Sequence, residues 1–160
     1  MKLDQFNKCV DSYADNLYRF VLGIVRSRAL AEDIMQDSYI KLWENRQKIM
    51  VGKEKSYLFT VAYRASISAL RNVRNQTPIE VPIWAMADSE EYDNRTEIMW
   101  RTLDTMNENQ RTVIMLFDWQ GYSYQEISQI MGITLPQVKI TIYRARMTLK
   151  EKLGDEYREL

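Results

Sequence analysis

The chain has 160 residues, and its 22 Lys and Arg residues balance its 22 Asp and Glu residues. It has no His and a single Cys, Cys9, which excludes an internal disulfide framework, a Cys-rich zinc site and any nucleophile pair or metal site that depends on His. The length allows one domain or two small ones.

The N-terminal segment, residues 1–10, contains several charged and amide side chains in place of the apolar core of a signal peptide. No apolar run approaches the roughly 20 residues of a membrane span. We therefore expect a soluble, cytoplasmic protein with no direct membrane insertion.

The first half of the chain has a helical pattern throughout. Apolar residues recur at steps of three and four and predict a long amphipathic first helix. They are Leu3, Phe6, Val10, Tyr13, Leu17, Phe20 and Ile24. Two further helices are expected at about 29–47 and 55–75, and no segment alternates as a strand does.

The middle of the chain differs in charge and composition from both sides. Residues 1–75 carry a net charge of +5, residues 76–100 carry −5, and residues 101–160 are neutral. The acidic segment contains Pro78 and Pro82 and shows no sustained helical period. It is interpreted as a linker over residues 76–94; the alternative is a long surface loop of a single domain.

Helix start signals follow one another in the second half. Asn94, Asn107, Ser123 and Thr134 each have Glu or Gln three residues further on, the spacing of a capping box. Gly121 and Gly132 occupy positions where a glycine commonly ends a helix. These signals predict four helices, at about 95–106, 108–119, 124–131 and 135–152.

The last two of these helices have the pattern of a helix-turn-helix. A short helix is followed by the turn Gly132-Ile133-Thr134 and then by a longer helix with Val138 and Ile142 facing inward. The outward side is basic and consists of Lys139, Arg144, Arg146 and Lys150. No acidic residue occurs between Thr134 and Lys150, so this helix can approach DNA phosphates without like-charge repulsion. The alternative is a helical hairpin with a solvated basic face.

Two stretches resemble the sigma factors of bacterial RNA polymerase. Residues 31–43, AEDIMQDSYIKLW, resemble the region-two signature, and residues 121–127, GYSYQEI, with the later QVK and YRAR, resemble region four. A chain this short with only these two regions is similar to the extracytoplasmic-function (ECF) subgroup. The resemblance implies an all-α protein with a region-two domain at 1–75, the acidic linker at 76–94 and a region-four helix-turn-helix domain at 95–160.

One face of the second helix is a candidate binding surface for the polymerase. Its residues fall at three- and four-residue steps and combine carboxylates, an amide and apolar groups. They are Asp33, Gln36, Asp37, Ile40 and Trp43. Such a face suits a partner helix with basic residues around an apolar groove, and the resemblance implies the clamp-helix coiled coil of the large polymerase subunit. Alternatively, Trp43 belongs to the core and Asp37 pairs with Lys41.

The loop between the second and third helices, residues 46–55, is a candidate site for melted promoter DNA. In the resembled family it captures an unstacked base, and apolar groups beside cations suit that task. The candidate residues are Lys48, Ile49, Met50, Lys53, Tyr63, Arg64 and Arg71. Tyr63 is equally interpretable as a core aromatic, and Arg64 and Ser68 depart from the residues usual in the family.

The recognition helix and the start of the supporting helix before it supply the candidate contacts to the upstream promoter element. By resemblance these are Tyr124, Gln137, Lys139, Tyr143, Arg144 and Arg146. Ile140 and Thr141 replace positions that are commonly Ser and Arg, which removes one bidentate guanine contact. We therefore expect a changed sequence preference.

The sequence thus predicts an ECF sigma factor that directs core RNA polymerase to promoters and assists their opening, without catalysis or cofactor. The family implies a membrane-linked anti-sigma factor as a further partner. One alternative is a stand-alone helix-turn-helix regulator that binds a palindrome as a dimer. Another is a helical adaptor that binds no nucleic acid.

Overall fold

The computed structural model describes residues 1–73 and 94–154, and every regular element in these two stretches is a helix. The chain forms two compact units, one built mainly on the first three helices and one mainly on the later helices. The predicted all-α fold with two small helical domains is confirmed. The expected linker, with Pro78 and Pro82, lies outside the described residues except for Asn94.

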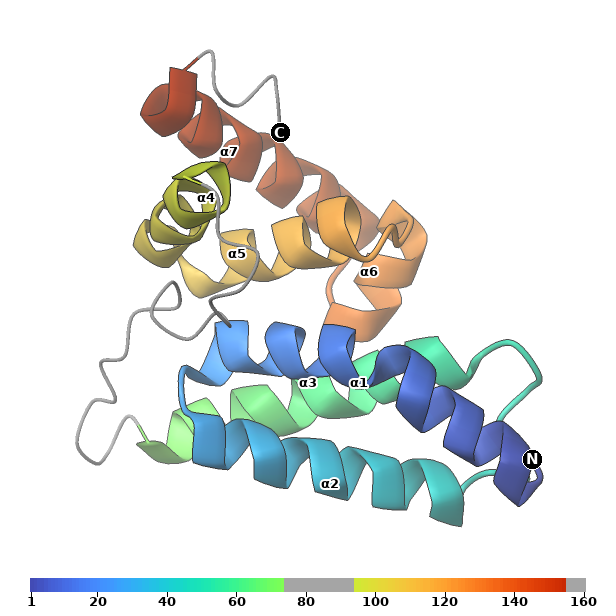
Figure 1. Cartoon of the computed structure of the whole chain (residues 1–160). Helices are drawn as coiled ribbons and strands as arrows, with labels where there is room; N and C mark the ends of the chain where they lie inside the picture. The colour runs from blue at the N-terminus through green and yellow to red at the C-terminus, as the bar shows by residue number, and fades with distance from the viewer. Residues whose placement is uncertain (74–93, 155–160) are drawn as a thin grey trace. The chain divides into compact units, whose positions relative to one another are not determined.

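The first unit consists of α1 (Leu3–Val25), α2 (Arg28–Glu44) and α3 (Glu54–Val73). Each helix packs against the other two, as Figure 1 shows. Their shared core is almost fully buried and contains Leu17, Phe20, Leu42, Leu58, Phe59 and Ala62. Phe20 of α1 meets Phe59 of α3 with ring centroids 5.1 Å apart. The predicted stripe of α1 enters this core only from Leu17 onward, because Leu3 is exposed and Phe6, Val10 and Tyr13 are partly exposed.

A two-residue corner separates α1 from α2. Arg26 ends α1 in the left-handed region, at φ 55°, and its backbone N–H donates to the carbonyl of Leu22. Ser27 then caps α2, because its Oγ accepts a hydrogen bond from the backbone N–H of Leu30. This cap starts α2 at Arg28, one residue before the predicted start.

The second unit consists of α4 (Asn94–Thr105), α5 (Glu108–Ile114), a π-helix η3 (Met115–Trp119), α6 (Tyr124–Met131) and α7 (Leu135–Leu153). α7 packs against both α4 and α5. The buried side chains come from every segment and include Leu103, Val113, Leu116, Ile127, Val138, Ile142 and Leu149.

Three of the four predicted capping signals form. Asn107 accepts from the backbone N–H of Gln110, and Ser123 and Thr134 each exchange hydrogen bonds with the residue three positions later. The side chain of Asn94, the fourth, lies outside the described part of the structure. The predicted helix at 108–119 differs in type, since its last five residues are π-helical. The helix predicted at 29–47 ends three residues early, at Glu44.

The turn between α6 and α7 is held at both ends. Gly132 has φ 67°, a left-handed conformation that an L side chain adopts with strain. The Oγ of Ser128 in α6 donates to the carbonyl oxygen of Ile133 at 2.6 Å, and Thr134 caps α7. The two helices of the motif are therefore fixed in orientation by local hydrogen bonds as well as by their buried faces.

None of the helices in the described residues is long and apolar enough to span a membrane. The same residues contain no group of three or more Cys, Asp or Glu side chains placed to hold a metal ion.

Candidate nucleic-acid and partner interfaces

The predicted face of α2 is open to solvent. Asp33, Gln36 and Asp37 are exposed, and Ile40 retains 54% of its accessible surface. The opposite side of α2 is buried in the core through Ala31, Ile34, Ser38 and Leu42. Within the described residues no ion pair joins Asp37 to Lys41, so the carboxylate is available to a partner.

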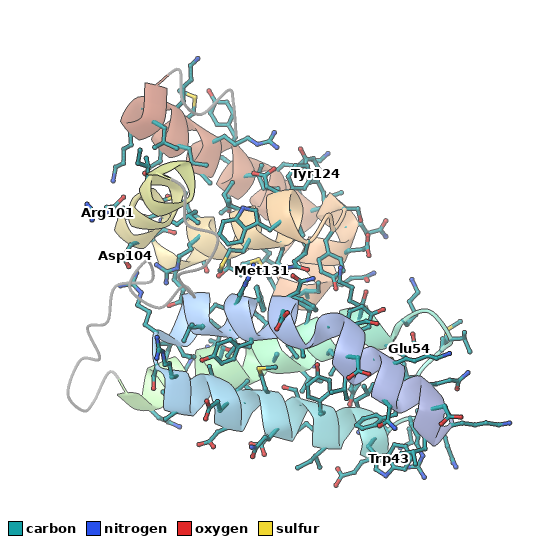
Figure 2. All side chains as sticks on the ribbon, in the orientation of Figure 1. Trp43, Glu54, Arg101, Asp104, Tyr124 and Met131 are labelled. Carbon is teal, nitrogen blue, oxygen red and sulfur yellow. The ribbon has the colours of Figure 1, made fainter. Side chains whose placement is uncertain are left out.

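Trp43 lies at the end of this face (Figure 2), and its side chain is partly buried. The ring of Phe6 meets it edge-on at a centroid distance of 5.1 Å, and the guanidinium of Arg46 lies 4.0 Å from the ring centroid. Arg46 also donates to the carbonyl oxygen of Trp43 at 2.7 Å. Trp43 is thus neither a core residue nor a free anchor, because its own unit fixes part of the ring and leaves part of it exposed.

Tyr39 and Cys9 lie behind the exposed face. The ring of Phe6 also packs edge-on against Tyr39, with centroids 6.4 Å apart. Burial, and secondarily the nearby Cys9, raises the pKa of Tyr39 to about 12. Burial, and secondarily the carboxylate of Glu54, raises the pKa of the Cys9 thiol. Both side chains are therefore uncharged at neutral pH, where they pack behind the exposed face of α2.

The loop after α2 presents an apolar tip among cations. Met50 and Val51 retain 73% and 94% of their accessible surface. Gly52 has φ 87°, and the backbone N–H of Lys53 donates to the carbonyl of Met50, which closes a tight turn at the tip. Lys48 and Lys53 are exposed, and Ile49 is partly buried. Figure 2 labels a residue near each end of this loop, Trp43 and Glu54.

The outer side of α3 continues the basic character of the loop. Arg64, Ser68 and Arg71 are all exposed and follow one another at helical spacing. Tyr63 is only partly exposed, so it is neither a fully buried core aromatic nor a fully exposed DNA-binding residue. The loop and this helix together contain all of the residues predicted for melted DNA.

The exposed side of α7 carries four of the six predicted upstream-element residues. Gln137, Lys139, Tyr143 and Arg144 are exposed, and Lys150 extends the basic side toward the C-terminal end. The inner side is anchored by Val138, Ile142, Ala145 and Leu149, all of them buried. α7 therefore presents a fixed surface to a ligand, and polar and basic side chains form part of that surface.

Arg146 differs from the other predicted cations. Its Nη2 pairs with Asp118 Oδ1 of η3 at 3.2 Å, and its guanidinium lies 5.0 Å from the ring centroid of Phe117. Phe117 in turn packs against Tyr124 at 5.0 Å between ring centroids. Arg146 and Tyr124 thus connect α7 and the start of α6 to η3.

Sequence reasoning missed three features of these surfaces. Val51 is the most exposed large apolar side chain among the described residues, and its position before Gly52 was the sequence signal that could have predicted this exposure. The partner of Arg146, Asp118, lies 28 residues earlier and has no local signal. The exposed apolar residues Ile140 and Met147 of α7 are seven residues apart, a helical spacing that marks a shared face.

A helix-turn-helix with a basic outer face, preceded by a three-helix unit, is typical of a DNA-binding protein. Residues 9–76 match the family described as Sigma-70 region 2, and residues 96–149 match Sigma-70, region 4. The chain belongs to the sigma-70 family and, within it, to the ECF subgroup of RNA polymerase sigma factors.

Several curated relatives have similar length and sequence. The ECF RNA polymerase sigma factor SigM of Bacillus subtilis is 26% identical over 86% of this chain and 88% of its own length. The RNA polymerase sigma factor CarQ of Myxococcus xanthus is 25% identical over 95% of this chain and 91% of its own length. The chain is thus similar to ECF factors across both units, which does not favour a stand-alone regulator.

Two solved structures share the fold. The sigma factor RpoE from Bartonella quintana, solved with the anti-sigma factor NepR, is 24% identical, with a TM-score of 0.81 over 96% of this chain and 99% of that chain. CnrH, solved with the cytosolic domain of CnrY, is 17% identical, with a TM-score of 0.66 over 95% of this chain and 89% of that chain.

Proposed function

We propose that this ECF sigma factor divides promoter recognition among three of its surfaces. The face of α2 binds core polymerase, the loop between α2 and α3 holds melted DNA, and the exposed side of α7 contacts the upstream promoter element. The observation that carries the proposal is the exposure of all three surfaces beside helix faces that are buried. We further propose a cytoplasmic protein without catalytic activity of its own.

For polymerase binding, Asp33, Gln36, Asp37 and Ile40 supply carboxylates and an amide around one apolar group, with Trp43 at the edge. A basic helix with an apolar groove complements this surface in charge and shape. Because Asp37 is exposed and unpaired within the described chain, its replacement should change binding and leave the folded state intact.

The test is a comparison of two charge reversals in the same unit. Asp37→Arg on α2 should lower the affinity for core polymerase by about tenfold or more, whereas Asp15→Arg, at an exposed carboxylate of α1, should not. Thermal unfolding of each variant checks that folding is retained. Equal polymerase affinity for Asp37→Arg and wild type would reject the assignment of this face.

For melted DNA, we propose that Met50 packs against an unpaired base while the exposed cations Lys48, Lys53, Arg64 and Arg71 hold phosphates. Ile49 and Tyr63, the two other residues predicted for this site, are partly buried. Fluorescence of 2-aminopurine placed in the melted element measures opening directly. Met50→Asp should reduce that signal without lowering the affinity for core polymerase.

For duplex DNA, we propose that Lys139, Tyr143 and Arg144 enter the major groove, with Gln137 and Tyr124 nearer the backbone. Arg146 is at the edge of this set because Asp118 already pairs with it. Run-off transcription from genomic fragments, with core polymerase and with or without this protein, tests the function as a whole. Identical transcripts in both reactions would contradict it.

We propose an anti-sigma protein as the regulatory partner. The observation that motivates it is the likeness to RpoE, solved with an anti-sigma factor, and to CnrH, solved with the cytosolic domain of CnrY. Copurification from cells of this protein with a second protein that also blocks run-off transcription would support the proposal. A copurifying protein that leaves transcription unchanged would count against it.

A further inference from the structure

The outermost line of side chains on α7 is apolar. Pro136, Ile140, Tyr143 and Met147 follow one another at steps of four, three and four residues, and all four are exposed. Ile140, Tyr143 and Met147 retain 47%, 64% and 40% of their accessible surface. We call these four residues the apolar ridge. A ridge of this kind on a surface helix is normally turned toward a core or a partner.

The apolar ridge lies between two rows of polar and basic side chains. By helical spacing, Lys139 and Lys150 border it on one side, and Gln137 and Arg144 border it on the other. The stretch from Thr134 to Lys150 contains no carboxylate. The charge on both sides therefore selects an anionic occupant, and cations flanking a helix on two sides suit the two phosphate backbones that border a major groove.

The apolar ridge is held outward by the packing of the opposite side of α7. The side chains there are at most 4% exposed and are Val138, Ile142, Ala145 and Leu149. The capping box between Thr134 and Gln137 fixes the first turn of the helix, where the ridge begins. Because both the rotation and the start of α7 are set in this way, the ridge stays on the surface and is available to a ligand.

The chemistry of the major groove identifies what an apolar side chain can recognise there. The C5-methyl group of thymine is the apolar group that the four base pairs present in the groove, and the other recognition groups are hydrogen-bond donors and acceptors. Ile140 offers neither a donor nor an acceptor, and it lies in the first half of α7, the part of a recognition helix that contacts base edges.

We propose that Ile140, with the ring of Tyr143 beside it, packs against thymine methyl groups of the upstream promoter element. This inference rests on the proposed role of α7 and names the group that it recognises. The factor then requires thymine at one or two positions of that element. A factor with a hydrogen-bonding side chain in place of Ile140 would select another base there. Met147 is two helical turns further along, about 10 Å from Ile140, and has no part in this contact.

The expected effect follows from the size of a methyl group. Removing one buried methyl group from an interface lowers affinity about four-fold. Uracil differs from thymine only by this methyl group, so replacing thymine with uracil removes the contact and leaves all base-pair hydrogen bonds in place.

The experiment uses holoenzyme assembled from core RNA polymerase and the full chain, on a promoter found by run-off transcription. Each thymine of the upstream element is replaced in turn by uracil, and holoenzyme affinity is measured for wild type, Ile140→Ala and Met147→Ala. For wild type and Met147→Ala, uracil should lower the affinity of the holoenzyme about four-fold at the same one or two positions. Ile140→Ala should bind the thymine promoter more weakly and show no further loss with uracil.

Two results would overturn the inference. The first is that no uracil substitution changes the affinity of wild-type holoenzyme, while Lys139→Ala still weakens binding. The proposed function of α7 would then stand, and the apolar ridge would instead bind a protein partner or a second copy of this chain. An undiminished uracil effect in Ile140→Ala assigns the methyl contact to another residue. A holoenzyme that transcribes from no fragment contradicts both proposals.

Discussion

Arg144 and Arg146 are two residues apart on α7, but their guanidinium groups have different surroundings. Arg144 is exposed, whereas Arg146 is paired with Asp118 and lies beside the ring of Phe117. A cation that is already paired within the protein gains less from a phosphate, because the first contact must be given up.

The first prediction compares the same substitution at these two residues. Arg144→Gln should make the salt dependence of promoter binding shallower by about one unit of slope and leave folding unchanged, since a phosphate contact is lost. Arg146→Gln should change the slope less and lower the free energy of unfolding by about 1 kcal/mol. Urea unfolding and binding at several salt concentrations measure both quantities. A larger slope change for Arg146→Gln would contradict this ranking.

Tyr39 packs behind the exposed face of α2, but the burial of its hydroxyl group is energetically unfavourable. Its hydroxyl is buried and finds no hydrogen-bond partner among the described residues. A buried polar group without a partner is destabilising, so the ring and not the hydroxyl accounts for the contribution of Tyr39 to packing.

The second prediction concerns the pH dependence of stability at this residue. The pKa of Tyr39 is raised from 10.0 to about 12 by folding, so between these values the folded state keeps a proton that the unfolded chain has lost. Stability is therefore full below about pH 10 and falls as the pH rises toward 12. Tyr39→Phe should be neutral or stabilising at neutral pH and should reduce this alkaline loss, measured by urea unfolding across the pH range. An unchanged alkaline profile would reject the assignment to Tyr39.

At the scale of the element, local hydrogen bonds decide where the helices of the second unit begin. Thr134 and Gln137 form a complete capping box, and Ser128 ties the turn to α6. These contacts involve residues close together in the sequence, so they form as soon as the local chain is helical.

The third prediction compares two threonines of α7. Thr134→Ala removes the N-cap and should cost about 1 kcal/mol of folding free energy and weaken promoter binding through the disturbed start of α7. Thr141→Ala removes a hydroxyl that bonds back to the carbonyl of Gln137, so it should be neutral or slightly stabilising. Thermal unfolding of both variants measures the difference. Equal costs would show that the cap contributes nothing.

The π-helix η3 shows how an element depends on more than its own sequence. The stretch MLFDW carries no local signal that distinguishes it from the α-helix before it. Its side chains instead meet residues from other helices, with Asp118 on Arg146 and Phe117 on Tyr124. The wider turn is therefore accompanied by tertiary contacts that bind η3 to α6 and α7.

At the scale of the whole molecule, each unit has its own buried core. Leu17, Phe20 and Phe59 belong to the first unit, and Leu116 and Ile142 belong to the second. Separate cores allow separate folding, although units of this size are only marginally stable.

The fourth prediction is that each unit folds by itself. A fragment of residues 1–75 and a fragment of residues 94–160 should each show helical circular dichroism and a cooperative urea transition, because the core of each lies within the fragment. The full chain measured under the same conditions is the control. A fragment without a cooperative transition would show that its core is incomplete without the remainder of the chain.

The sequence by itself determined the helical fold class and the helix-turn-helix. Apolar residues at helical spacing located α1 to α3, and the signals at Asn107, Ser123, Gly132 and Thr134 located the ends of the later helices to within a few residues. These features could be predicted because helix periodicity and capping depend on residues within one or two turns of each other.

Only the tertiary structure decided which predicted site residues are free. It paired Arg146 with Asp118, placed Trp43 between Phe6 and Arg46, and left Ile140 exposed on the outer side of α7. Contacts such as Arg146 with Asp118 join residues 28 positions apart. They depend on how whole helices pack, and packing is set by the shapes of buried faces rather than by any local pattern of the sequence.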